Sequence, residues 1–170
     1  MKFHYTTKNE PVKEYRPNSK EKQSLLDEYY RMANQIIEIP IIIGGKDVKT
    51  ASTNKCIMPH DHQNTLANYH LAEKEEVTKA IDNSLESWNS WSKSSLDYRT
   101  KIFRKAAELL QGKWRDTINA ATMLNQSKNA FQAEIDSACE LIDFFNFNAE
   151  YAEKINSQQP LISPEGVKNY

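Results

Sequence analysis

Hydrophobic residues recur along most of this chain at the three- and four-residue intervals that place them on one face of a helix. The intervals predict helices over residues 24–37, 77–91, 94–111, 113–124 and 130–155. Ser94 and Asp97 have the spacing of a capping box at the start of the third helix. The side chains expected to face the core include Ile102, Phe103, Leu109, Trp114 and the stripe from Val77 to Trp91.

Shorter segments have the pattern of β-structure. A β-branched run enters Gly44-Gly45 within residues 41–48, which predicts a hairpin. A further strand is expected over 64–71, where alternate residues face opposite sides. The predicted organisation is an extended arm at 1–22, a short helix at 23–38, a hairpin and strand at 39–72, a helical part at 73–156 and a linker at 157–170.

The last predicted helix carries two apolar stripes rather than one. Residues 135, 138, 142, 145, 149 and 152 form the first stripe, and Leu141, Phe144, Phe147 and Tyr151 lie outside it. Two stripes indicate two packing partners. Glu140 shares the second stripe with Phe144, where a carboxylate is costly unless it is paired or hydrogen-bonded. The alternatives are a salt bridge, a position at the wet edge of the stripe, or a functional role.

Composition limits the classes of function. A net charge of −1 argues against binding to nucleic acid or to a membrane surface, and no apolar run is long enough to span a bilayer. With four glycines, the chain contains neither of the common glycine-rich nucleotide-binding motifs. Two cysteines and the absence of a secretory signal favour a reducing compartment, and we expect a cytoplasmic protein.

Several residues are candidates for chemistry, each with a plainer interpretation. His60 and His62 would share one side of a strand and reach one metal ion, but no third ligand is near, and a solvated loop is favoured. Cys56 and Cys139 are candidate nucleophiles, and structural roles are favoured for both. Lys128 is explained as a helix-terminal lysine favoured by the helix dipole.

Several short sequences in this chain are similar to those of one family. They are Asn9-Glu-Pro-Val12, Pro59-His-Asp-His62, Ala120-Ala-Thr-Met-Leu124, Gln126-Ser-Lys-Asn129, Gln132-Ala-Glu-Ile-Asp136 and Glu140-Leu-Ile-Asp-Phe-Phe145. With the order of predicted elements, they resemble the N-terminal third of an aldehyde dehydrogenase. The last two sequences resemble the branch that oxidises L-glutamate γ-semialdehyde, the open form of Δ1-pyrroline-5-carboxylate.

The resemblance implies an α+β, mostly helical segment of a larger α/β fold, whose Rossmann-type core and catalytic domain are absent from these residues. It implies NAD-dependent oxidation of the semialdehyde to L-glutamate in proline catabolism, with the catalytic cysteine and glutamate beyond Tyr170 and no NAD site within the chain. By the same resemblance, Glu140 and Phe144 contact the substrate, a small molecule, and Glu140 helps to seat its ammonium group.

The resemblance also implies partners. They are the remainder of the dehydrogenase chain and further copies of the enzyme in a homo-oligomer, and the compartment would be the mitochondrial matrix in a eukaryote. The sequence stops at Val167-Lys-Asn-Tyr170 without a polar tail, so we expect a truncated chain that is inactive alone. A standalone, non-catalytic interaction module derived from the same fold is the alternative.

Overall fold

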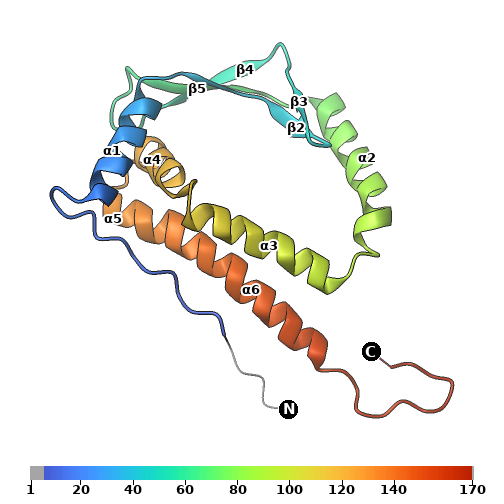
Figure 1. The fold of residues 1–170 in the computed structure, drawn as a ribbon. Coiled ribbons are helices and arrows are strands. Elements are labelled where there is room, and N and C mark those ends of the chain that lie inside the picture. The colour runs from blue at the N-terminus through green and yellow to red at the C-terminus, as the bar shows by residue number, and fades with distance from the viewer. Residues whose placement is uncertain (1–5, 170) are drawn as a thin grey trace.

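The computed structural model describes residues 6–169, which are mostly helical (Figure 1). The helices are α1 (Lys20–Ala33), α2 (Lys74–Trp91), α3 (Leu96–Gln111), α4 (Arg115–Gln126) and a continuous last helix made of α5 (Ala130–Ala133), the π-helical segment η1 (Glu134–Cys139) and α6 (Glu140–Ser157). The strands are β1 (Ile37–Ile39), β2 (Ile41–Ile43), β3 (Lys46–Val48), β4 (Thr53–Ile57) and β5 (Thr65–His70). The predicted α+β, mostly helical class is confirmed. Among the described residues, no helix is both long and apolar enough to cross a membrane.

The strands form two small sheets. In the larger sheet β5 is central, with β1 parallel on one side and β4 antiparallel on the other. The predicted hairpin is β2 and β3, joined by Gly44 and Gly45, which both have positive φ as a tight two-residue turn requires. A Cβ at Gly44 would lie 2.8 Å from Nδ2 of Asn83 on α2, so the Asn83 side chain would have to move to admit it.

The boundaries of the helices differ from the predicted ones by two to four residues, most of all in α1. Helix α1 begins at Lys20, because the Ser19 side chain caps it by accepting a hydrogen bond from the backbone N–H of Lys22. The predicted helix at 23–38 is wrong at its end, since α1 stops at Ala33 and residues 37–39 pair with β5 as β1. Helix α3 is capped by Ser95 rather than Ser94.

The core lies where α3, α4 and the last helix meet. Ala107, Ala138 and Ile142 are buried there, and Leu110, Ile118 and Phe145 pack against them. Ile142 belongs to the first stripe of the last helix, which therefore has the packing partner that the pattern indicated. Small residues at Ala107 and Ala138 let the two helices lie close together (Figure 1).

Other apolar faces are not covered by the described residues. The stripe of α2 is exposed, with Leu85 at 64% and Trp88 at 65%, and the expectation that it faces a core is wrong here. Exposure also contradicts the inward placement of four further side chains: Ile102, Phe103, Leu109 and Trp114. Figure 1 gives the reason, because α2 stands between the sheet and α3 at the side of an open, ring-like arrangement. Helical spacing identifies an apolar face but does not supply its partner.

The N-terminal arm is extended and lies along the last helix (Figure 1). Residues 6–18 contain no helix or strand, and their partners on the last helix are more than one hundred residues away in sequence. Residues 158–169, predicted as part of a linker, likewise contain no helix or strand and are exposed. The predictions for residues 1–5 and 170 lie outside the described residues.

Candidate functional site

Glu140 and Phe144, the two predicted substrate contacts, line the same open hollow of about 390 Å³ on α6. The other lining residues are Asn9, Asp143, Phe147, Asn148 and Tyr151. Steps of three, four and seven residues from Glu140 put the α6 residues on one side of the helix. Both Glu140 and Phe144 are exposed, so the Glu140 carboxylate is at the wet edge of the second stripe and needs no buried partner. Within the described residues, Phe144 and Tyr151 of that stripe are exposed, and the second packing partner stays a prediction.

Asp143 fastens the arm beside this hollow. Its Oδ1 accepts a hydrogen bond of 2.7 Å from the backbone N–H of Glu10, and its Oδ2 accepts one of 2.8 Å from Asn9 Nδ2. Neither Asp143 nor Asn9 was a candidate from the sequence. Both lie within short sequences that resemble the family, which was the only available signal, because a contact across 134 residues leaves no local pattern.

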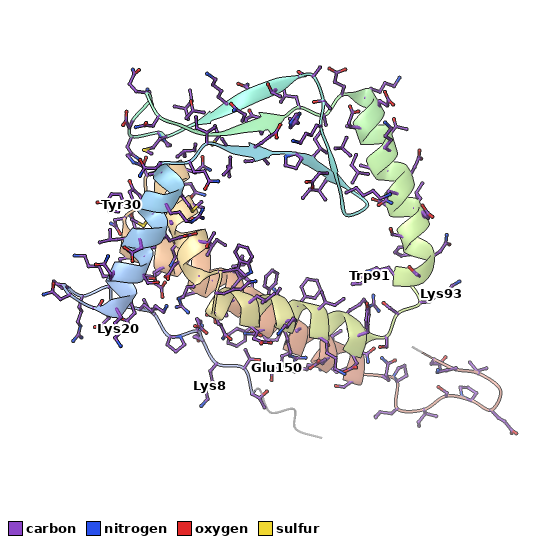
Figure 2. All side chains as sticks on the ribbon, turned by 45° about the horizontal axis from the view of Figure 1, so that its top comes forward. Lys8, Lys20, Tyr30, Trp91, Lys93 and Glu150 are labelled. Atoms are coloured by element: carbon purple, nitrogen blue, oxygen red, sulfur yellow. The ribbon has the colours of Figure 1, made fainter. Side chains whose placement is uncertain are left out.

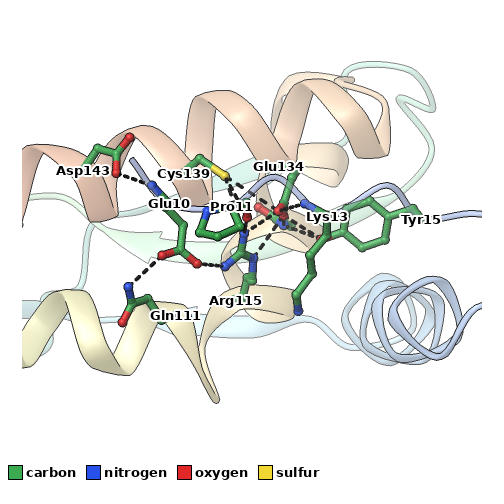
Figure 3. A network of polar contacts seen from close by, with 10 residues as sticks. Glu10, Pro11, Lys13, Tyr15, Gln111, Arg115, Glu134, Cys139 and Asp143 are labelled. Carbon is green, nitrogen blue, oxygen red and sulfur yellow. Dashed lines mark hydrogen bonds and ion pairs between the residues drawn. The ribbon is translucent and has the colours of Figure 1, made fainter. Parts of the chain in front are cut away.

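A buried ion pair forms the centre of a larger polar network, drawn in Figure 3. Arg115 is 2% exposed and Glu134 is fully buried. The Arg115 guanidinium donates to both oxygens of Glu134, and also to Glu10 and to the carbonyl oxygen of Pro11. Two helices and the arm are therefore joined through one guanidinium group, whose planar shape suits several acceptors at once.

Glu134, the first residue of η1, accepts three further hydrogen bonds. The backbone N–H of Lys13 donates at 2.8 Å, the Tyr15 hydroxyl at 2.7 Å and Asn119 Nδ2 at 2.8 Å. A π-helical segment shifts the side chains around the helix axis, and no local sequence pattern announced it. The sequence pattern did not predict this network. The one sign of it was Arg115, a charged residue three positions before the core residue Ile118 and therefore on the same side of α4.

The pKa values of this network follow from burial and pairing. Burial alone would raise the pKa of Glu134, but the hydrogen bonds from Arg115 and from the Lys13 backbone outweigh burial and lower it to about 2. Burial would lower the pKa of Arg115, and the hydrogen bonds to Glu134 and Glu10 raise it instead. Burial and the neighbouring Glu134 carboxylate both raise the pKa of Tyr15. The pair is therefore ionised at neutral pH, which suits a structural role rather than proton transfer.

Glu150 fastens the first described residues of the arm (Figure 2). Its two carboxylate oxygens accept hydrogen bonds from the backbone N–H groups of Thr6, at 2.6 Å, and Thr7, at 2.8 Å. Hydrogen bonds from Thr7 and Thr6 lower its pKa. Glu134, Asp143 and Glu150 are thus three acids of the last helix that all hold the arm, which explains why a helix with apolar stripes also carries these acids.

Both cysteines are free thiols, and the surroundings of each favour a structural role. Cys139 is buried beside the ion pair, and burial together with the Glu134 charge raises its pKa to about 11, so it is a poor nucleophile. Cys56 donates to Asn125 Oδ1 at 3.0 Å and is half-buried. Lys128 pairs with Asp136 at 2.8 Å rather than serving only the helix dipole.

His60 and His62 lie in the turn between β4 and β5 rather than on a strand. His60 Nδ1 is 2.9 Å from Ser127 Oγ, and Asp61 forms hydrogen bonds with Gln63 and Asn64 of its own turn. Across residues 6–169, no group of three or more histidines, cysteines and acids is arranged to hold a metal ion.

The start of α2 does not fit the pyrophosphate of a dinucleotide. Such cofactors place their pyrophosphate against a glycine-rich turn at the start of the helix that follows a strand. Here β5 is followed by α2, whose first turn contains Glu75 and Glu76 and whose cap is Glu73. These carboxylates would repel a pyrophosphate, and no glycine is present between β5 and α2.

The chain is similar to members of a known protein family. The sequence profile of the aldehyde dehydrogenase family matches residues 47–170. The chain is 42% identical over 162 residues, 95% of its length, to the Δ1-pyrroline-5-carboxylate dehydrogenase of Agaricus bisporus. It is 38% identical over 164 residues, 96% of its length, to the mitochondrial Δ1-pyrroline-5-carboxylate dehydrogenase of Dictyostelium discoideum.

A solved structure agrees with these relatives. The Mycobacterium tuberculosis Δ-pyrroline-5-carboxylate dehydrogenase, crystallised with NAD, superposes on 96% of this chain with a TM-score of 0.91 and 37% identity. The chain spans 30% of the length of the Agaricus relative, 29% of the Dictyostelium relative and 31% of the Mycobacterium chain.

Proposed function

This chain belongs to the aldehyde dehydrogenase family, and from that premise we propose that it forms the N-terminal part of a dehydrogenase oxidising L-glutamate γ-semialdehyde to L-glutamate in proline catabolism. One observation carries the proposal, namely the similarity over 96% of the chain to the Mycobacterium enzyme, in fold as well as in sequence. That enzyme is named for Δ1-pyrroline-5-carboxylate, the cyclic form of the same substrate.

NAD is the proposed cofactor, by analogy with the Mycobacterium enzyme bound with NAD. When bound, it would supply the acceptor for the hydride of the aldehyde. Because the start of α2 is acidic, we propose that NAD is held by residues outside these 170. The catalytic cysteine and glutamate are proposed to lie there as well, so that the 170 residues alone are inactive.

Within this chain, we propose that Glu140 seats the ammonium group of the substrate and that Phe144 packs against its carbon chain. The exposed Glu140 carboxylate forms no hydrogen bond with another protein group within the described residues. A charged acceptor of this kind pairs well with an ammonium group. The neighbouring Phe144 ring offers an apolar surface on the same side of α6.

Glu140→Gln in the complete enzyme tests this assignment. A hydrogen bond between charged groups contributes about 1.5 kcal/mol or more, so we expect KM for the semialdehyde to rise roughly tenfold. The KM for NAD should not change. Asp136→Asn is the matched control, because Asp136 is on the same helix and pairs with Lys128 outside the hollow. Equal KM values in the two variants would contradict the role of Glu140.

Measurements on the isolated 170-residue chain distinguish this proposal from the alternative function, a standalone interaction module. Oxidation of the semialdehyde or reduction of NAD by that chain alone would contradict the proposed division of labour. A cooperative melt of a monodisperse chain would favour the module. We propose a cytoplasmic location, with the mitochondrial matrix as the alternative in view of the Dictyostelium name, and a homo-oligomer for the complete enzyme.

A further inference from the structure

The N-terminal arm supplies one side of the hollow that contains Glu140. Asn9 lines this hollow, although 134 residues separate it from Asp143 on α6. Carboxylates of the last helix fix the path of the arm on both sides of Asn9, since Glu150 holds Thr6 and Thr7 and Glu134 holds Lys13. The position of Asn9 at the hollow is therefore set by the same contacts that fasten the arm.

The orientation of the Asn9 side chain is also set. Its Nδ2 donates to Asp143 Oδ2 at 2.8 Å, and Asp143 is itself held by the backbone N–H of Glu10. With the NH2 group engaged, the carbonyl oxygen Oδ1 remains as an acceptor, and no hydrogen bond to it is formed within the described residues. Asn9 therefore brings a neutral acceptor to a hollow that already contains the Glu140 carboxylate.

The rest of the lining favours a positively charged group with N–H donors. None of the lining side chains is basic. Three of them are aromatic, Phe144, Phe147 and Tyr151, and the faces of aromatic rings attract cations. An ammonium group has three N–H donors, which one carboxylate does not satisfy by itself.

We infer that Asn9 is a second recognition group for the substrate's ammonium group and acts beside Glu140. This inference rests on the proposed function and extends it, because it assigns substrate specificity to the arm. In this arrangement Glu140 supplies charge and Asn9 Oδ1 supplies a further acceptor. The arm is then part of the substrate site as well as a structural strap.

The test uses the complete enzyme and two aldehydes of equal chain length, L-glutamate γ-semialdehyde and glutarate semialdehyde, which lacks the α-ammonium group. The measured quantity is the ratio of their kcat/KM values. Asn9→Ala should lower this ratio about five- to tenfold, the range for one lost hydrogen bond. The KM for NAD and the thermal midpoint should stay at their wild-type values, since Asn9 is exposed.

Two further variants serve as controls. Asn9→Gln keeps the amide and is expected to keep the ratio within about twofold of the wild type. Lys8→Ala changes the neighbouring side chain of the arm, which points away from α6 (Figure 2), and should leave the ratio unchanged.

The outcomes separate this inference from the proposed function. An unchanged ratio in Asn9→Ala would overturn the inference, and so would an equal loss of activity toward both aldehydes, which is the sign of a purely structural effect. Failure of the wild-type enzyme to oxidise L-glutamate γ-semialdehyde would overturn the proposed function itself.

Discussion

Replacing Glu134 by glutamine tests whether one buried carboxylate joins the arm and α4 to the last helix. Glu134 is fully buried and accepts hydrogen bonds from Arg115, Tyr15, Asn119 and the backbone of Lys13. Glutamine keeps one carbonyl oxygen but puts an NH2 donor where these donors need an acceptor. It also removes the charge opposite a buried guanidinium group.

The expected loss of stability is about 3 kcal/mol at neutral pH. The pairing lowers the pKa of Glu134 from 4.5 to about 2, and each pH unit of such a difference corresponds to about 1.4 kcal/mol. Measurements on other buried ion pairs, in which removal of one partner costs about 3–5 kcal/mol, agree with this value. Arg115 keeps its contact with Glu10, which places the loss at the lower end of that range.

The same pKa fixes the pH dependence. A carboxylate whose pKa is lower in the folded state stabilises the fold above its unfolded pKa, and this stabilisation is lost as the pH falls through the folded pKa. For Glu134 that interval runs from 4.5 down to about 2. The difference in stability between the wild type and Glu134→Gln should therefore be greatest near pH 7 and shrink below pH 4.5.

Urea unfolding of the complete enzyme at pH 7 and pH 3, followed by tryptophan fluorescence, measures both effects. Trp114, which directly precedes Arg115, reports on this region once the other tryptophans, such as Trp88 and Trp91, are replaced by phenylalanine. Asp136→Asn is the matched control, because its partly exposed pair with Lys128 contributes about 1 kcal/mol or less. The reasoning would be refuted if Glu134→Gln cost no more than the control, or if its cost were the same at both pH values.

Two further predictions concern the thiols and the arm. In the native chain at pH 8, a thiol reagent should modify Cys56 readily and Cys139 only after unfolding, because Cys139 is buried and its pKa is raised to about 11. Modification of both thiols at equal rates would contradict this prediction. The variant Cys56→Ser identifies which thiol reacts. Glu150→Gln should speed hydrogen exchange at the amides of Thr6 and Thr7, which donate to that carboxylate, and unchanged exchange at these two amides would show that other contacts hold the arm.

The regular elements could be predicted because their causes are local. Gly44-Gly45 specified the hairpin through the positive φ that both residues adopt. The spacing around Ile142 identified the buried side of the last helix. The end of α1 was mispredicted, because Ile36 and Ile37 also fit the helical spacing. In the structure Ile37 is a strand residue, since it pairs with Ala67 of β5.

Glu140 and Phe144 could be placed on one side of a helix from their four-residue separation, and the structure brings them to one hollow. Their role was indicated by resemblance alone and stays a proposal. Asn9 and Asp143 were not predictable as neighbours, because a hydrogen bond across 134 residues depends on where the arm lies.

By itself, the sequence determined which segments are helical or extended and which faces of the helices are apolar, since these follow from propensity and spacing along the chain. Only the tertiary structure decided which apolar faces are covered and which acids are buried. The stripe of α2 and the side chain of Glu134 show the difference, as the stripe is exposed and the carboxylate is fully buried. Burial depends on what packs against a side chain, and here the partners of the acids of the last helix come from a distant arm.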